Sequence, residues 1–384
     1  MRGTITKRGR ASWRLKFDAP SADGKRNTQY VTVRGGKKDA QATLNELLAA
    51  VGKGTFVPAD KVSVAEHVRT RIGIWHTGGE IGDATRERYD VLLKKQIAPH
   101  IGGLLLQRLG TADVQAWHTK MRAAGLSPVT VRHAHAVLRK ALGDAVRHGQ
   151  LSRNVCGPDG QRAPKVPKKK PVIIKGKQLA DVVEKLRGTA VYPEAMLALF
   201  CGLRAGEVLA LSWSAIDLEK RTLQVRASVE EVAGQPLKIK KPKTDDGVRQ
   251  VTMPDIVVEA LRDHRRQQLE LRMALGQGRP DADALVFPGD LNGGPGRRTA
   301  LSIRWGKVAE AIGIPEVTFH NLRHSHASQL IAAKVDIVTI SARLGHADPS
   351  ITLKVYSHEF EESDEAAANA INAALGANAV PKNG

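Results

Sequence analysis

The chain has 384 residues, 42% hydrophobic and 26% charged, which is the composition of a soluble globular protein long enough for two or three domains. Its 59 lysines and arginines outnumber 39 aspartates and glutamates, and the net charge of +20 favours a polyanionic partner, with nucleic acid first. The lack of a long apolar run, a signal peptide or a cysteine framework excludes membrane-spanning and disulfide-rich secreted classes. We therefore expect a cytoplasmic, nucleoid-associated protein.

Residues 1–58 are predicted to form a small β-sheet followed by a helix. The stretches GTITKRG, ASWRLKFD and QYVTV are typical of short strands, and a helix is expected over residues 39–51. In the second strand Leu15 and Phe17 alternate with Arg14 and Lys16, so one face of the sheet should be basic. Such a face could enter a groove of DNA, and a plain solvated sheet is the alternative.

The next segment, residues 62–155, is predicted to be an all-α domain of four helices. The stretches VSVAEHVRTRIGIW, ATRERYDVLLKKQIAPHI, GTADVQAWHTKMRAAG and SPVTVRHAHAVLRKALGDAVRHG each repeat apolar residues at helical spacing. Lysines and arginines populate the polar sides, so the bundle could grip a duplex. A proline-rich linker is expected over residues 156–171. Its lysines are candidate phosphate contacts, although such a run is usually a solvated hinge: Lys168, Lys169 and Lys170.

Residues 172–384 are predicted to form a mixed α+β domain that is mainly helical. RTLQVRASVEEV, PLKIKKP and VRQVTMP are expected to be three adjacent strands, with the turn KTDDG between the last two. Helices should surround them. The tail after Tyr356 is predicted to form a short helix with Ala367, Ile371 and Leu375 on its apolar side. Cys156 and Cys201 are expected to be ordinary thiols.

The stretch TFHNLRHSHASQL raises the question of a metal site, because His320 and His324 stand four residues apart as in helical zinc ligands. Arg323 lies between them, and a fixed cation would repel a divalent metal but help to hold an anion. Asn321 replaces the glutamate that the zinc-protease pattern requires. Arg323 and Asn321 thus favour an anion over a metal, and the stretch by itself leaves the choice open.

Further polar residues in this segment each have a structural alternative. Arg204 and Glu207 could be a simple helix ion pair, Lys243 a solvated turn residue, His346 a histidine in a tight turn and Tyr356 a packing residue. A phosphodiester, however, needs forked cationic donors on its non-bridging oxygens, proton donors and a nucleophile, and this set supplies them.

The stretches GLRAGE, the KT turn, HNLRHSHAS, LGH and TLKVYSH together resemble the tyrosine recombinases of the phage integrase family. The resemblance covers the third segment and extends more loosely to the helical segment, as a core-type DNA-binding domain, and to the N-terminal sheet, as an arm-type DNA-binding domain. It implies a site-specific integrase with these catalytic residues, supported by Glu207: Arg204, Lys243, His320, Arg323, His346 and Tyr356.

The resemblance implies that Tyr356 attacks a DNA phosphate to give a 3′-phosphotyrosine, with Lys243 as acid for the 5′-oxygen. No metal or ATP should be required. The resemblance therefore assigns TFHNLRHSHASQL to phosphate binding rather than zinc binding, and His324 and His326 are expected to be packing or supporting residues. The expected partners are double-stranded attachment sites and three further copies in a tetramer on DNA. It leaves open whether a host DNA-bending protein or an excision factor takes part.

Three alternatives remain at this point. A resolvase of the Xer type shares the site but usually lacks the N-terminal sheet, and a type IB topoisomerase works as a monomer. A DNA-binding regulator without catalysis would explain the charge, but not the order of the polar residues.

Overall fold

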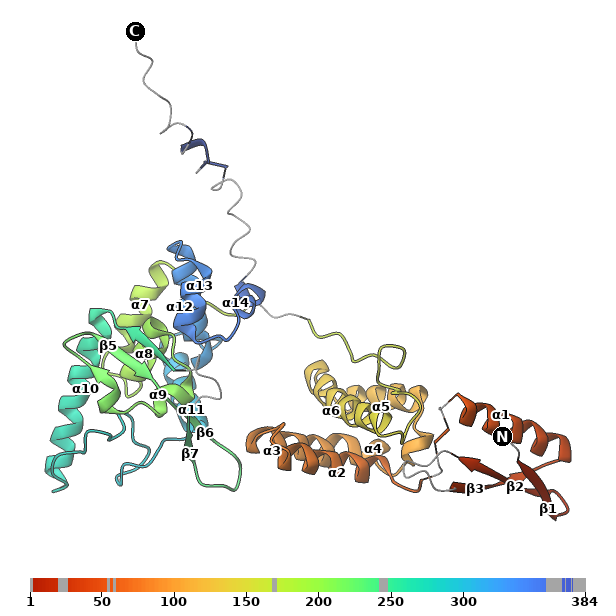
Figure 1. Ribbon diagram of the computed structural model, residues 1–384. Helices are drawn as coiled ribbons and strands as arrows, with labels where there is room; N and C mark the ends of the chain where they lie inside the picture. The colour runs from red at the N-terminus through yellow and green to blue at the C-terminus, as the bar shows by residue number, and fades with distance from the viewer. Residues whose placement is uncertain are drawn as a thin grey trace, which may run out of the picture. The chain divides into compact units, whose positions relative to one another are not determined.

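The computed structural model describes residues 3–19, 27–53, 56–57, 60–167, 171–241, 248–356, 368–369, 371–373 and 375. The chain forms two compact units, Met1–Lys168 and Lys169–Gly384 (Figure 1). The boundary falls inside the segment predicted as a linker. The first unit contains two hydrophobic clusters, one under the N-terminal sheet and one among helices, so its two parts pack around separate cores.

The N-terminal part is a three-stranded antiparallel sheet covered on one face by a helix, as the alternation predicts. Leu15 and Phe17 are buried beneath the helix, whereas Arg14 and Lys16 lie on the opposite face. On that face the Arg14 guanidinium lies 4.3 Å from the ring centroid of Tyr30. The elements are β1 (Thr4–Gly9), β2 (Ser12–Ala19), β3 (Asn27–Arg34) and α1 (Lys37–Gly52).

The helical part follows, and its start signals act as the sequence indicates. Ser127 accepts a hydrogen bond from the backbone of Thr130, with Pro128 in the first turn. The second predicted helix is interrupted by a π-helical turn. The predicted linker begins too early, because Cys156 is 1% exposed within this core. The elements are α2 (Val64–Thr77), α3 (Asp83–Leu92), η1 (Leu93–Ile97), α4 (Ala98–Ile101), η2 (Leu106–Arg108), α5 (Thr111–Ala123) and α6 (Pro128–Arg147).

The second unit is mainly helical, with α8 packed against both α10 and α12 in its core (Figure 1). Its helices are α7 (Lys177–Leu186), α8 (Tyr192–Cys201), α9 (Ala205–Leu209), η3 (Trp213–Ala215), α10 (Asp255–Ala274), α11 (Arg298–Ala311), α12 (Phe319–Ala332), α13 (Ile337–Leu344) and α14 (Pro349–Tyr356). Its strands are β4 (Ile216–Asp217), β5 (Thr222–Val225), β6 (Ser228–Glu230), β7 (Lys238–Lys240) and β8 (Arg249–Thr252).

These strands correct the expectation of three adjacent strands. The first predicted strand is broken after Val225, so that β5 pairs with β4 and β8 while β6 pairs separately with β7. The reason is that pairing between distant strands, which strand propensity does not encode, decides the register. Residues 242–247, including Lys243 and the predicted turn, lie outside the described residues.

The C-terminal tail and the two cysteines can be compared with the prediction only in part, because some of the tail lies outside the described residues. Ile371 and Leu375 are helical and exposed, whereas Ala367 lies outside the described residues. Cys156 and Cys201 are both buried and form no disulfide. Within the part of the chain that the structure describes, no helix is long and apolar enough to cross a membrane.

Candidate active site

The corner between α8 and α9 builds one wall of the site. Gly202 ends α8 in the left-handed conformation, with φ 70°, where a Cβ atom would lie 2.7 Å from the His326 ring. The chain then turns so that Arg204 caps the start of α9, as its position in the sequence indicates. The carboxylate of Glu207 accepts the Arg204 backbone N–H at 2.8 Å, which fixes where the Arg204 side chain begins.

Glu207 is the anion that organises the cations of the site. Its carboxylate accepts a hydrogen bond from Arg204 Nη1 at 2.8 Å and a forked pair from Arg249 at 2.8 and 3.2 Å. Burial alone would raise the pKa of Glu207, but the hydrogen bonds and charge of Arg249 and the charge of Arg204 lower it to about 2. Glu207 is therefore ionised at neutral pH and does more than pair with a helix neighbour.

Arg323 projects from α12 into a cavity that Arg204 also lines, and it is only 3% exposed. Its guanidinium donates to the carbonyl oxygen of Gly202 and, at 2.6 Å, to that of Leu344. Burial and the charge of Arg204 lower its pKa to about 9, so it remains protonated at neutral pH. Glu207 lies 4.0 Å away. Because the carbonyl partners are neutral, much of the positive charge of Arg323 is left for an anion in the cavity.

His346 follows Gly345, which ends α13 in the left-handed conformation with φ 66°. Its Nε2 accepts a hydrogen bond from Arg323 Nη2 at 3.0 Å, so the proton of the neutral ring is on Nδ1. Nδ1 then donates to the hydroxyl of Thr352 at 2.8 Å. Burial, followed by the charge of Arg323, lowers the pKa of His346 to about 4. His346 is therefore a neutral, oriented imidazole at the cavity.

Tyr356 is the last residue of α14, and its ring is buried against α12 and α13. Its hydroxyl oxygen lies 2.6 Å from His324 Nδ1. His320 is exposed one turn away, with its ring edge-to-face with that of His324 at 4.8 Å between centroids. The protein around His320 still desolvates the ring and, with Arg323 and Arg204, lowers its pKa. The side chains of His320, His324, His346 and Tyr356 thus border one cavity.

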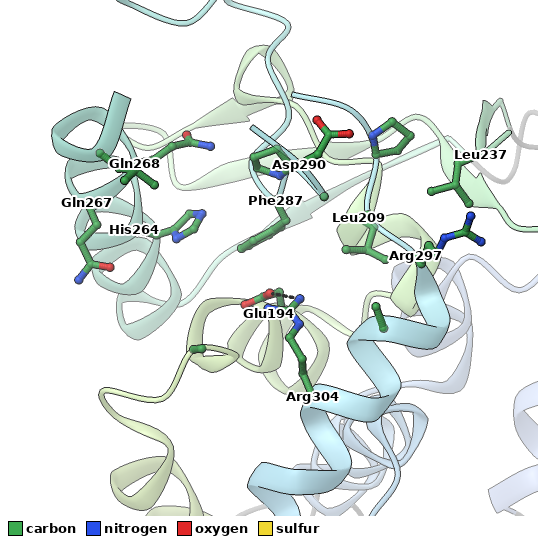
Figure 2. A pocket seen from close by; sticks show the side chains of 17 residues that line it. Glu194, Leu209, Leu237, His264, Gln267, Gln268, Phe287, Asp290, Arg297 and Arg304 are labelled. Carbon is green, nitrogen blue, oxygen red and sulfur yellow. Dashed lines mark hydrogen bonds and ion pairs between the residues drawn. The ribbon is translucent and has the colours of Figure 1, made fainter. Parts of the chain in front are cut away.

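This cavity is small, about 310 Å³, and it is lined by the predicted residues Arg204, His320, Arg323, His346 and Tyr356. A larger cavity of about 850 Å³ lies elsewhere in the same unit, between α10, α11 and the start of α8 (Figure 2). There the buried Glu194 pairs with Arg304 at 3.0 Å, and none of the predicted catalytic residues lines it. The chemistry of the residues, rather than cavity size, identifies the smaller cavity as the candidate site.

The structure thus brings five of the predicted catalytic residues and Glu207 together. Lys243 lies outside the described residues, as do the linker lysines 168–170. Arg14 and Lys16 belong to the other unit. Among the described residues, no group of three or more potential metal-ligating histidine, cysteine, aspartate and glutamate side chains is assembled.

Sequence reasoning missed Arg249. It lies on β8 and shares the buried face of that strand with Val251. An arginine at a core-facing position of a strand is unusual, and this was the signal that could have revealed it. Sequence reasoning also did not predict the contact between His324 and the hydroxyl of Tyr356, because the two residues are 32 positions apart.

Comparisons with known proteins find similar chains among recombinases and integrases. The phage integrase family matches residues 176–363. The tyrosine recombinase XerC-like protein of Caldanaerobacter subterraneus is 26% identical over 351 residues, which cover 88% of this chain and 89% of that protein. The putative prophage phiRv2 integrase of Mycobacterium tuberculosis is 27% identical over 294 residues, covering 76% of this chain and 74% of that protein.

Among solved structures, the Tn1549 transposon integrase in complex with a circular intermediate DNA shares the fold. The TM-score is 0.69 at 20% sequence identity, and the match covers 81% of this chain and 99% of that chain. Together with the arrangement of arginines, histidines and tyrosine, these similarities identify residues 176–363 as a domain of the phage integrase family. The relatives that match most of the chain are a tyrosine recombinase and an integrase.

Proposed function

We propose that the chain is an integrase that cleaves and rejoins DNA strands at specific sites through a 3′-phosphotyrosine intermediate. The observation that carries this proposal is the shared cavity of Arg204, Arg323, His346 and Tyr356. It puts two cations, a neutral imidazole and a phenol around one cavity, which are the groups that phosphodiester transfer needs. A DNA-binding regulator would gain nothing from such an arrangement.

In the proposed reaction the two guanidiniums bind the non-bridging oxygens of the scissile phosphate. They neutralise the charge that builds in the pentacoordinate transition state, and the burial of Arg323 strengthens its part of this effect. Glu207 forms an ion pair with Arg204, and its negative charge limits the repulsion between the arginines. The neutral rings of His320 and His346 orient the phosphate or share protons with it.

Tyr356 gives its proton to a neutral histidine of the cavity, its oxygen forms the new bond to phosphorus, and the bond to the 5′-oxygen breaks. An ordinary tyrosine has a pKa of about 10, and the nearby cations favour its phenolate. Lys243 is proposed to protonate the departing 5′-oxygen. The phosphotyrosine conserves the bond energy, so a second 5′-hydroxyl reseals the strand without ATP. We propose that the arginines supply the charge neutralisation that metal ions provide in many nucleases, so no metal is required.

The exposed face of the N-terminal sheet is proposed to bind DNA outside the crossover. Arg14 and Lys16 supply positive charge on that face, and Tyr30, 53% exposed beside Arg14, adds an aromatic surface. The linker lysines are proposed as additional phosphate contacts. The overall charge of +20 supports this reading.

Strand exchange between two duplexes requires four active sites, so we propose a homotetramer on DNA. A lambda integrase tetramer bound to a Holliday junction, with a TM-score of 0.52 to this chain at 15% identity, offers a precedent. A host DNA-bending protein or an excision factor is a further candidate partner.

A resolvase of the Xer type is the second candidate function, and the similarity to the XerC-like protein favours it. The N-terminal sheet instead favours an integrase. The DNA substrate distinguishes the two functions. An integrase joins two different attachment sites, whereas a resolvase acts on two copies of one site.

The test uses nicked duplexes from DNA that flanks the gene, incubated in EDTA with wild type, Tyr356→Phe and the control Tyr192→Phe. Denaturant-resistant adducts are expected with wild type and the control only. Strand exchange retained by Tyr356→Phe would refute the assignment. Specific binding by all three proteins with no adduct would favour a regulator.

A further inference from the structure

The hydroxyl of Tyr356 has a partner that the proposed reaction does not yet use. His324 Nδ1 lies 2.6 Å from the Tyr356 oxygen, and the two rings meet at an interplanar angle of 60°. Tyr356 is 2% exposed, and His324 is partly buried. Both side chains line the cavity that holds Arg204 and Arg323. The contact therefore involves the atom that attacks the phosphate.

The charge state of His324 determines which group donates. Burial, followed by the charges of His320 and Arg323, lowers the pKa of His324 to about 4, so the ring is neutral at neutral pH. A neutral imidazole has one nitrogen that accepts, and a phenol hydroxyl is a good donor. Nearby cations favour negative charge on the phenol oxygen, which makes the hydroxyl donate more readily. The hydroxyl of Tyr356 accordingly donates to Nδ1, and Nε2 carries the ring proton.

We propose that His324 is a further residue of the reacting site, which accepts the Tyr356 hydrogen bond and holds the nucleophilic oxygen toward the phosphate cavity. The proposal rests on the recombinase function proposed above and deepens it. An aligned hydroxyl costs less to bring into attack geometry than one that rotates among several positions.

The position of His324 on α12 explains how one helix can serve both reactants. Arg323, the residue before it, binds the phosphate, and His324 holds the oxygen that attacks. The start of α12 is fixed by Thr318, whose hydroxyl accepts the backbone N–H of Asn321. The distance between phosphate and nucleophile is set by how α14 packs on α13 and how α13 packs on α12, with the Tyr356 ring buried against both helices.

The experiment compares three substitutions at this position in the full chain: His324→Asn, His324→Gln and His324→Leu. An asparagine amide can reach the place of Nδ1, whereas a glutamine amide reaches that of Nε2, so the pair carries the same group at two positions. Single-turnover adduct formation is measured on the nicked duplex, together with DNA affinity and thermal midpoint.

We expect His324→Leu and His324→Gln to slow adduct formation about 10-fold at unchanged DNA affinity, as for the loss of one aligned hydrogen bond. His324→Asn should restore most of the rate. A general loss of structure would slow all three variants in parallel with their thermal midpoints, so it would not produce this order.

The proposal is overturned if His324→Leu reacts within twofold of wild type, or if His324→Asn is no faster than His324→Gln. These outcomes are distinct from failure of the proposed function. If the proposed function failed, the wild-type protein itself would bind its DNA and form no adduct.

Discussion

Glu207 offers the most quantitative test of how the site is held together. Its carboxylate is 7% exposed and bridges Arg204 and Arg249, with Arg323 at 4.0 Å. The shift of its pKa from 4.5 to about 2 corresponds to about 3 kcal/mol at 1.36 kcal/mol per pKa unit. Glu207→Gln keeps the shape and removes the charge, so we expect the free energy of unfolding to fall by about 3 kcal/mol at pH 7.

The pH dependence provides the check on this reasoning. A carboxyl with a lowered pKa stabilises the fold fully above its unfolded value of 4.5, and the contribution is lost as pH falls toward about 2. The difference between wild type and Glu207→Gln should therefore shrink to less than half by pH 3.

The assay is pulse proteolysis of the full chain across a urea series, with thermolysin at pH 7 and pepsin at pH 3, quantified from peptides of α8. The matched control is Glu219→Gln, because Glu219 forms an ion pair with Arg262 at the surface, where it is 87% exposed. The control should stay within about 0.5 kcal/mol of wild type. A loss below about 1 kcal/mol for Glu207→Gln at pH 7, or an equal loss at both pH values, would contradict the proposed role.

Three further predictions follow from the same structure. Arg323→Lys removes a buried fork of donors, so single-turnover adduct formation should fall on the order of 10²- to 10³-fold, and a rate within threefold of wild type would exclude the predicted phosphate contact. Arg14→Ala and Lys16→Ala should each lower the slope of log affinity against log salt by about 1 on arm-type DNA. An unchanged slope would show that the exposed face of the N-terminal sheet does not contact DNA phosphates. Burial, followed by the charge of His118, lowers the pKa of His135 from 6.5 to about 4. The free energy of unfolding should therefore fall as pH drops below 6.5, by about 2 kcal/mol at pH 5. Thermal unfolding of wild type and His135→Gln at pH 7 and 5 checks this, and an equal pH response of the two proteins would refute it.

Local sequence determined much of the secondary structure and the set of candidate catalytic residues. Alternation placed Leu15 and Phe17 under α1, and apolar spacing gave the helices their buried faces. The order of the arginines, histidines and tyrosine identified the chemistry, because helical spacing puts His320 and Arg323 on neighbouring positions of one face. These features depend on residues a few positions apart, so the pattern itself contains them.

The tertiary structure decided the contacts between distant residues. Arg249 reaches Glu207 across 42 positions, and His324 meets Tyr356 across 32. The split of the strands into two small sheets was likewise set by which strands paired. Propensity and periodicity describe one segment at a time, whereas these contacts depend on how α8, α12 and α14 pack. The sequence alone therefore determined which residues could react, and the packing decided which of them hold the nucleophile and the cations in place.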